Sequence, residues 1–579
     1  MMELHAYTRT ISELLSVNKK YVVPRFQREY SWVKEQINEL WIDTLSNIKY
    51  DEETNSYSWD EYFIGSLVLI GDDTDNSMQI VDGQQRLTTL TILLSVLCQR
   101  FVEIDKEPLA QALYDNYIAG KDDDGEYFFK LVNESPKPFF QNNIQHIVKK
   151  GEQPETNEEK TLISAYSELY NLSAANNISS LLNKEIKNND EYELALKAIR
   201  EQVVRYLKVI FITVNEEDEA YTIFETLNAR GMNLSYVDLI KNKIFKELNG
   251  SHPDDDAKTK WNKIRKIIAS RSGIGSMEQF MRHWWMSNHS YVSSENLYKA
   301  FIKKWRKGEI NAAIFLDELL DDAETYLKIA SPMAEDFPQQ EDKLILRSLQ
   351  ALKLFNITQN RPFLMSLLKA KSKGTLRHAD LLRAFSTIEK FHLAFNAVCS
   401  LRPSGIEGSY SKAARALSDN SATKQKNAQA IDSLLDTLRG RFPERDVFID
   451  KFKSIKFNNK ETKQKKLIQY IFASIEKSRA LTDEFLPDLI SIEHIMPQSV
   501  GNLEEASMIG NLLPLSKELN ERAGNKSINA KLAIYHESQF LLVQQFLGSY
   551  DPTQGAWSKS EILANAALYA SELYDLNSI

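Results

Sequence analysis

The hydrophobic pattern of the first part of the chain alternates between strand-like and helix-like segments. Residues 62–70 (YFIGSLVLI) are a short apolar run, and residues 78–82 (MQIVD), which follow an acidic turn, are typical of its partner strand in a hairpin. Residues 87–100 have the pattern of a buried helix, and residues 206–214 (YLKVIFITV) form another β-rich run. This mixture predicts an α/β domain over residues 1–245.

The remainder of the chain has mainly helical periodicity. From 246 to 430, apolar and charged residues recur three and four positions apart, which predicts a helical middle region. Within it, the glycines and serines of 403–423 predict a loop or linker. Residues 431–579 return to a helical pattern, apart from the mixed segment 488–525. The whole pattern predicts a predominantly helical α+β protein in three parts.

Length and charge limit the classes of protein that fit. A chain of 579 residues exceeds what one hydrophobic core usually supports, so about two to four domains are expected. With 71 basic and 80 acidic residues the net charge is −9, which argues against a surface coated in positive charge. A local basic groove for nucleic acid remains compatible with this balance, because only the surface that faces the phosphates must be positive.

Cysteines and apolar runs bear on the cellular compartment. The two cysteines, Cys98 and Cys399, form no CxxC pair, which argues against a zinc knuckle and against a disulfide framework and fits a reducing cytoplasm. The first residues lack the positive start and long apolar stretch of a signal peptide, and the most apolar run, 87–98, is too short to span a bilayer. We therefore expect a cytoplasmic protein with no membrane partner. The sequence leaves a homo-oligomer open.

A group of polar residues near the C-terminus carries the strongest chemical signal. Glu493 and His494 end a short apolar segment and are followed by Pro497, while Asn511 and Asn520 come later. Hydrolysis of a phosphodiester needs an activated water, and histidine has the proton affinity suited to that task near neutral pH. His494 is therefore the candidate general base. We expect Asn511 to accept a hydrogen bond from the second imidazole nitrogen and so fix the tautomer.

The order of these residues resembles the ββα-metal fold of HNH nucleases. In that fold an acidic-His pair lies on the first strand, an Asn-Leu pair marks the second, and a helix contributes a His or Asn near its start. By motif position, Glu493 and Asn520 are the candidate ligands of one hard divalent cation, Mg²⁺ or Mn²⁺. A lone His beside a Glu is usually a surface or capped pair, so this interpretation depends on all four positions occurring in order.

A second candidate site lies between the predicted strand 78–82 and the helix that follows. It consists of Asp82, Gly83, Gln84, Gln85 and Arg86. Gly83 permits close approach of the backbone at a helix start, where amides attract phosphate, and Arg86 is suited to bidentate phosphate binding. Asp82 could hold a metal or a sugar hydroxyl, and the two glutamines could place a leaving group or read a base. An Asp-Gly turn that caps a helix also explains Asp82 and Gly83.

Two further blocks contain arginines that could reach the same phosphates. In residues 23–32 (VPRFQREYSW), Arg25 and Arg28 alternate with aromatic side chains that can stack a base. The alternative is a loop that packs its rings into the core and leaves its arginines solvated. In residues 224–245, Arg230 lies in a polar turn between two predicted helices, which is equally typical of a plain helical hairpin.

Together these blocks resemble the GmrSD family of modification-dependent (type IV) restriction endonucleases. The N-terminal part is similar to ParB-like and sulfiredoxin-like nucleotide-binding folds. The resemblance implies a domain over 1–245 that binds and hydrolyses an NTP around residues 82–86, and an HNH-like nuclease domain over 431–579. It also implies a defence role against modified or foreign phage DNA, without selecting the DNA mark or the NTP.

Two other functions remain compatible with the sequence. One is a nucleotide-regulated DNA-binding or scaffold protein that does not cleave, and the other is a nuclease that acts on RNA. Residues 451–466 hold seven lysines against one acid, Glu461. This stretch fits contact with phosphates, although such charge runs are also typical of a solvated face.

Overall fold

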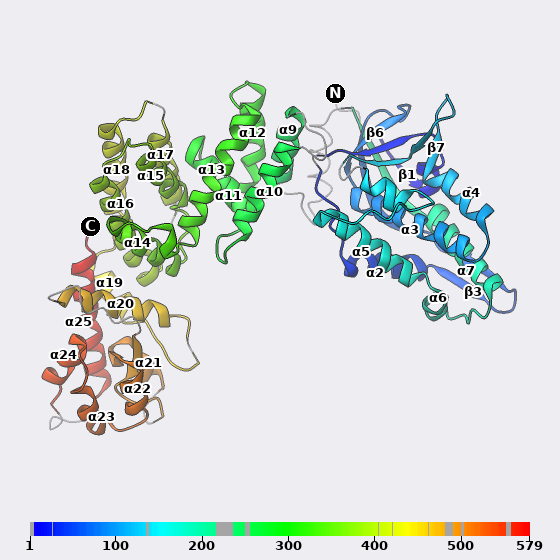
Figure 1. Ribbon diagram of the computed structural model, residues 1–579. Coiled ribbons are helices and arrows are strands. Elements are labelled where there is room, and N and C mark those ends of the chain that lie inside the picture. Colours follow the sequence, from blue (N-terminus) through cyan, green and yellow to red (C-terminus); the bar gives the residue numbers. More distant parts are fainter. Residues whose placement is uncertain are drawn as a thin grey trace. The chain divides into compact units, whose positions relative to one another are not determined.

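The structure is a computed structural model and divides into two compact units (Figure 1). One unit comprises Met1–Lys260 with Lys304–Leu316, and the other comprises Trp261–Lys303 with Asp317–Ile579. The residues that the structure describes are 5–25, 27–134, 138–215, 236–248, 255–402, 404–419, 421–460, 462–480, 490–499, 503–551 and 557–579.

A six-stranded mixed sheet forms the centre of the first unit, in the order β1-β10-β5-β6-β2-β9. The pairs β1–β10 and β5–β6 are antiparallel, and the other pairs are parallel. Two small ribbons, β3–β4 and β7–β8, stand apart from it. The strands are β1 (His5–Thr10), β2 (Lys20–Val23), β3 (Ile48–Asp51), β4 (Ser56–Trp59), β5 (Tyr62–Ile70), β6 (Ser77–Asp82), β7 (Ala119–Lys121), β8 (Tyr127–Phe129), β9 (Leu131–Asn133) and β10 (Leu207–Val214).

The hairpin predicted from residues 62–82 is confirmed as β5 and β6, in which Leu69 lies opposite Ile80. A register shift between Val68 and Leu69 brings Val68 opposite Asp82, the last residue of β6. The β-rich run near residue 210 is confirmed as β10, the parallel neighbour of β5. This arrangement places Asp82 at a strand end beside the centre of the sheet.

Helix α3 (Gln84–Glu103) is the core helix of the first unit and confirms the predicted buried helix. It begins after Gly83, whose φ of 92° suits glycine, and a Cβ there would lie 2.8 Å from Leu67 Cδ1. Helices α4, α5 and α7 pack against α3 (Figure 1). The other helices of this unit are α1 (Ile11–Leu15), α2 (Lys34–Leu45), α4 (Glu107–Tyr117), η1 (Gln141–Gln145), α5 (Asn157–Leu172), α6 (Ala175–Leu182), α7 (Asn189–Glu201), η2 (Gln202–Tyr206) and α9 (Tyr236–Glu247).

The second unit is almost entirely helical, and three helices contain a boundary between the units: α10 (Asp256–Ala269), α12 (Leu297–Arg306) and α13 (Ala312–Ala330). The helices that follow the pattern of the middle region are α11 (Met277–Asn288), η4 (Ser294–Asn296), η5 (Ala334–Asp336), η6 (Gln340–Asp342), α14 (Lys343–Leu354), α15 (Arg361–Ser372), α16 (His378–His392), η7 (Leu393–Val398), α17 (Ile406–Ser418) and α18 (Lys424–Arg439).

The loop predicted for residues 403–423 is wrong over most of its length, because helix α17 occupies 406–418. Ile406, Tyr410 and Leu417 recur at helical spacing and are buried, and this burial outweighs the glycine and serine content. Gly405, with φ of 76°, lies at the start of the helix.

The C-terminal part contains the only strands described in the second unit, β11 (Ser491–His494) and β12 (Leu512–Leu515), which pair antiparallel. The helices around them are α19 (Arg445–Phe452), α20 (Lys465–Arg479), α21 (Leu503–Ser507), η8 (Ile509–Asn511), α22 (Lys517–Ala523), α23 (Ile528–Tyr535), α24 (Leu541–Ser549) and α25 (Lys559–Asn577). Their apolar side chains bury the hairpin in one hydrophobic cluster.

The predicted fold class, a predominantly helical α+β protein, is confirmed, and the structure places a mixed sheet near the N-terminus. Over the stretches of chain that the structure covers, no helix combines the length and apolar composition needed to cross a membrane.

Candidate functional site

The β11–β12 hairpin sets the direction of the candidate catalytic side chains. In its register Glu493 pairs with Leu513 and His494 pairs with Leu512. Because successive side chains of a strand point to opposite faces, Glu493 and His494 diverge. The predicted order of strand, strand and helix is confirmed, since β12 is followed directly by α22, which contacts β11.

A polar cavity of about 370 Å³ lies beside this hairpin. Its wall includes the candidate base and both candidate metal ligands, so the fold brings three residues selected from the sequence to one hollow. The residues of its wall include Phe457, Lys465, Glu493, His494, Gln498 and Asn520.

The imidazole of His494 is held in one orientation by Phe457. The Nε2 atom lies 3.0 Å from the Phe457 carbonyl oxygen, which only accepts, so Nε2 carries the proton and Nδ1 carries the lone pair. The Phe457 ring stacks on the imidazole, with ring centres 5.6 Å apart and planes at 25°. Burial lowers the pKa of His494 from its ordinary value, which keeps the ring neutral near pH 7. The lone pair of the ring is therefore on Nδ1. The amide nitrogen of Gln498 lies 3.3 Å from Nδ1 and 3.1 Å from Nε2, so this amide has to move aside before Nδ1 can accept a proton from water.

The predicted role of Asn511 is wrong. Its Nδ2 donates to the carbonyl oxygens of Met496 and Ala506, at 3.0 and 2.8 Å, and its Oδ1 accepts from the Met496 backbone and from Trp557 Nε1, at 2.8 and 3.0 Å. These four bonds use the full capacity of the amide, so none remains for the imidazole. Asn511 instead holds the turn after β11, and the Phe457 carbonyl fixes the tautomer.

Glu493 lies on the buried face of β11, with 3% of its surface exposed. Its Oε1 is 2.7 Å from the ammonium of Lys531 and accepts a hydrogen bond of 2.9 Å from the Tyr535 hydroxyl. Lys531 also donates to the His494 carbonyl oxygen at 2.6 Å. Burial raises the pKa of Glu493, and the Lys531 ammonium opposes that shift. Sequence reasoning missed Lys531 and Tyr535, because a lysine on a helix usually indicates a solvated position.

Asn520, the second candidate metal ligand, lies on α22. Its Nδ2 donates to Ser491 Oγ at 2.5 Å and to the Ile492 carbonyl oxygen at 3.2 Å. The amide nitrogen therefore faces the strand, which leaves Oδ1 as the atom for a cation. An amide oxygen and the carboxylate of Glu493 are the hard donors that Mg²⁺ and Mn²⁺ prefer, so the residues fit such an ion in kind. Lys531 competes with it for the carboxylate.

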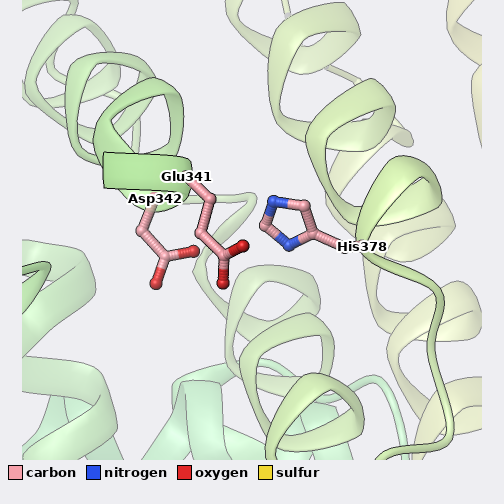
Figure 2. Close-up of side chains that lie close together, drawn as sticks. All are labelled: Glu341, Asp342 and His378. Atoms are coloured by element: carbon pink, nitrogen blue, oxygen red, sulfur yellow. The ribbon is translucent and has the colours of Figure 1, made fainter. Parts of the chain in front are cut away.

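A separate group of metal-binding residue types consists of Glu341, Asp342 and His378 (Figure 2), whose ligand atoms lie within 4.8 Å of one another. The ammonium of Lys371 lies 2.5 and 2.7 Å from the two carboxylate oxygens of Asp342, so a cationic side chain already neutralises it. The group shares no residue with the His494 cavity, and we assign it no part in the chemistry.

In the first unit, Asp82 and Arg86 flank the start of α3 as a pair. Arg86 Nη2 lies 3.3 Å from Asp82 Oδ2, and Nη1 donates to the Ile64 carbonyl oxygen at 2.9 Å. The guanidinium covers Gly65, where a Cβ would lie 1.6 Å from Nη1. Burial raises the pKa of Asp82, and the positive charges of Arg86 and Arg28 oppose that shift. The exposed Arg28 thus acts electrostatically on the same pair.

Gln84 and Gln85 are buried and support the arginine-containing segment. Gln84 Nε2 donates to the Arg28 carbonyl oxygen at 2.9 Å. Gln85 donates to the Glu29 carbonyl oxygen at 3.2 Å and accepts from the Ser31 backbone at 2.8 Å. The two amides therefore fasten residues 27–31, which we call the strap, to the start of α3.

Helices α9 and α10, and the residues next to them, contact the strap and Arg25. Arg25 pairs with Asp255 and donates to the carbonyl oxygens of Phe245, at 2.7 Å, and Leu248 near the end of α9. The contacts that the structure gives Arg25 are therefore with the C-terminal end of α9 and with Asp255, and none of them is with Asp82. Arg230 lies outside the described residues.

Two lysines complete the contacts on this side of the strap. Lys241 of α9 donates to the Gln27 carbonyl oxygen at 3.4 Å. Lys258 of α10 lies 3.7 Å from Glu29 and 3.6 Å from the buried Glu158. The strap is thus bound by α3 on one side and by α9 and α10 on the other.

Comparison with known protein families gives a match in each of two parts of the chain. The family model for the GmrSD restriction endonuclease N-terminal domain matches residues 11–245. The model for the GmrSD restriction endonuclease C-terminal domain matches residues 442–571. The first match contains Asp82 and Arg86, and the second contains the His494 cavity. No curated protein matches the chain.

Proposed function

Because the chain belongs to the GmrSD family of restriction endonucleases, we propose that it cuts modified or foreign DNA at His494, with a divalent cation bound and under control of an NTP. The geometry that supports the cutting site is an imidazole that lines a polar cavity and whose Nε2 faces the Phe457 carbonyl oxygen, which leaves the lone pair on Nδ1. DNA is the substrate class that a restriction endonuclease implies.

The proposed reaction is hydrolysis of one phosphodiester. His494 Nδ1 takes a proton from water as the water oxygen bonds to phosphorus, and the bond from phosphorus to the departing sugar oxygen breaks. The departing oxygen takes a proton from solvent. The imidazolium later releases its own proton to solvent, which restores the neutral ring. Mg²⁺ or Mn²⁺ held by Asn520 and Glu493 would stabilise charge on the phosphoryl and departing oxygens. This makes the activity HNH-like in its proposed chemistry.

The cutting activity is tested by a cleavage panel of modified and unmodified phage DNA, each with and without NTP, in Mg²⁺ or Mn²⁺. We expect cleavage that a chelator abolishes, because the oxygen donors of the site suit those ions. Tight, salt-sensitive DNA binding without cleavage of any substrate would support the non-cleaving DNA-binding function. Preferential cleavage of RNA would support the RNA nuclease.

For the first unit we propose NTP binding and hydrolysis at the start of α3. Two features support the proposal: the helix N-terminus attracts phosphate, and the positive charges of Arg86 and Arg28 both act on Asp82 beside it. Gln84 and Gln85 contribute by holding the strap that carries Arg28. The strap contacts α9 and α10 and therefore offers a route for control.

Replacing Asp82 with alanine is expected to lower NTP turnover about 10- to 100-fold, since loss of a residue that orients a binding side chain typically has that effect. Without the carboxylate, the Arg86 guanidinium loses the ion pair that orients it. The measurement is phosphate release by the full chain. Asp60→Ala is the matched control, because the Asp60 side chain is exposed and forms an ion pair with the likewise exposed Lys49. Unchanged turnover in Asp82→Ala would remove the nucleotide role and leave the nuclease proposal standing.

A further inference from the structure

The position of Phe457 is fixed by pairing with the segment that leads into β12. Its backbone N–H donates to the Ser507 carbonyl oxygen at 2.8 Å, and Ile509 donates to Ile455 at 3.0 Å. An isolated bridge joins Lys456 to Met508 between these bonds. Residues 455–457 therefore act as an additional backbone edge beside the hairpin, and they hold the carbonyl that orients His494.

The Phe457 ring also contacts Lys465, the first residue of α20. The Lys465 ammonium lies 5.8 Å from the centre of the same ring that stacks on the His494 imidazole at 5.6 Å. Both side chains belong to the wall of the one cavity. Attraction to the ring face holds the ammonium near this position. An anion that reaches Nδ1 of His494 therefore enters the field of a positive charge.

Lys465 differs from the other lysines of the stretch 451–466 in lying on the cavity wall, and two of those lysines are already paired with carboxylates. Lys453 pairs with Asp450 at 3.3 Å, and Lys456 pairs with Glu504 at 3.0 Å. Lys465 is exposed, and no carboxylate of the described residues forms an ion pair with it. It is the one lysine of the stretch on the cavity wall. The Lys465 ammonium therefore attracts an anionic group that enters the cavity.

We infer that Lys465 binds a non-bridging oxygen of the phosphodiester presented to His494, so that the DNA backbone passes between α20 and β11. The inference rests on the proposed function for the identity of the substrate. An ammonium is a compact point charge that suits a single phosphate, and each neutralised phosphate releases condensed counterions. Lys465 therefore neutralises one phosphate beside the bond that is cut and contributes about 0.9 to the slope of log affinity against log salt.

The test measures binding of a fluorescein-labelled 25-base-pair duplex to the full chain by anisotropy, over a range of KCl concentrations. All proteins carry His494→Ala so that no DNA is cut. Lys465→Ala is expected to reduce the slope of log affinity against log salt by about 0.9. Lys466→Ala is the matched control, because Lys466 is the adjacent exposed lysine but does not line the cavity, and we expect its slope to equal that of the parent.

In a parallel cleavage assay with His494 intact, Lys465→Ala is expected to lower kcat/KM, and Lys465→Arg is expected to restore most of it, since arginine keeps the charge. Equal salt slopes for Lys465→Ala and its parent, or equal effects of Lys465→Ala and Lys466→Ala, would overturn the inference. Binding with the expected change in slope but without cleavage by the intact protein would instead reject the proposed nuclease function. Matching melting curves exclude misfolding as the cause.

Discussion

Alanine in place of His494 is expected to lower the nicking rate about 100- to 10,000-fold, the usual contribution of a general base. Among the described residues of the cavity wall, this variant removes the one imidazole, the side chain best suited to proton abstraction from water near neutral pH. The rest of the site should persist, because the hairpin is held by its own backbone bonds and by Asn511. Plasmid nicking by the full chain in Mg²⁺ or Mn²⁺ measures the effect.

The matched control is His536→Ala. His536 is an exposed histidine at the end of α23 in the same part of the fold, and it does not line the cavity. We expect this variant to nick DNA at the parental rate. Parental nicking by His494→Ala would end the assignment of the base.

The pH dependence of the intact protein gives a second readout of the same residue. Only the neutral imidazole can take a proton, so the rate should fall as pH falls through the pKa of His494. Burial lowers that pKa, and the acidic limb of the kcat/KM profile is therefore expected below the value of about 6.5 that is usual for a free histidine. An acidic limb above that value would contradict the burial of the ring.

The second large effect is expected from Lys531→Met. This change leaves the Glu493 carboxylate buried without its ammonium, and breaking one side of a buried ion pair typically costs about 3–5 kcal/mol. The His494 carbonyl also loses its hydrogen bond from Lys531. We expect the free energy of unfolding of the hairpin region to fall by that amount, as measured by hydrogen exchange across residues 491–535 in urea.

A double variant separates the charge from the packing. Glu493→Gln with Lys531→Met removes both charges, so most of the lost stability should return if the unpaired carboxylate is the cause. Lys517→Met is the surface control, because Lys517 is 84% exposed and its ion pair with Glu521 is long, at 3.8 Å. Comparable destabilisation by Lys517→Met would show that the effect does not arise from the buried pair.

The local parts of the candidate site were predictable from the sequence. Ser491–His494 follows a short apolar segment and ends in the His, Leu512–Leu515 is an apolar run preceded by Asn511, and the hairpin forms from these two stretches. The buried helix α3 and the β5–β6 pair likewise follow from runs of adjacent residues. Each of these elements could be predicted because the residues that indicate it lie close together in the sequence.

The partners of those residues were not predictable, because they depend on distant packing. Phe457 precedes His494 by 37 positions and acts through its backbone carbonyl, which every residue type has. Lys531 is buried only because α23 packs its ammonium under β11. Asn511 was given the wrong hydrogen-bond partner, because its actual partners are backbone groups of Met496 and Ala506 and the distant Trp557, which the sequence does not bring together.

The strap has a thermodynamic consequence for the proposed control by NTP. Its backbone accepts hydrogen bonds from Gln84 and Gln85 of α3 and from Lys241 of α9, so the strap connects the two helices. Each such bond is worth only about 0.5–1.5 kcal/mol, which is small enough for a ligand to break. Linkage is reciprocal. If nucleotide binding changes the equilibrium constant between two positions of α9 and α10 by some factor, a change in that equilibrium from another cause must change the nucleotide affinity by the same factor.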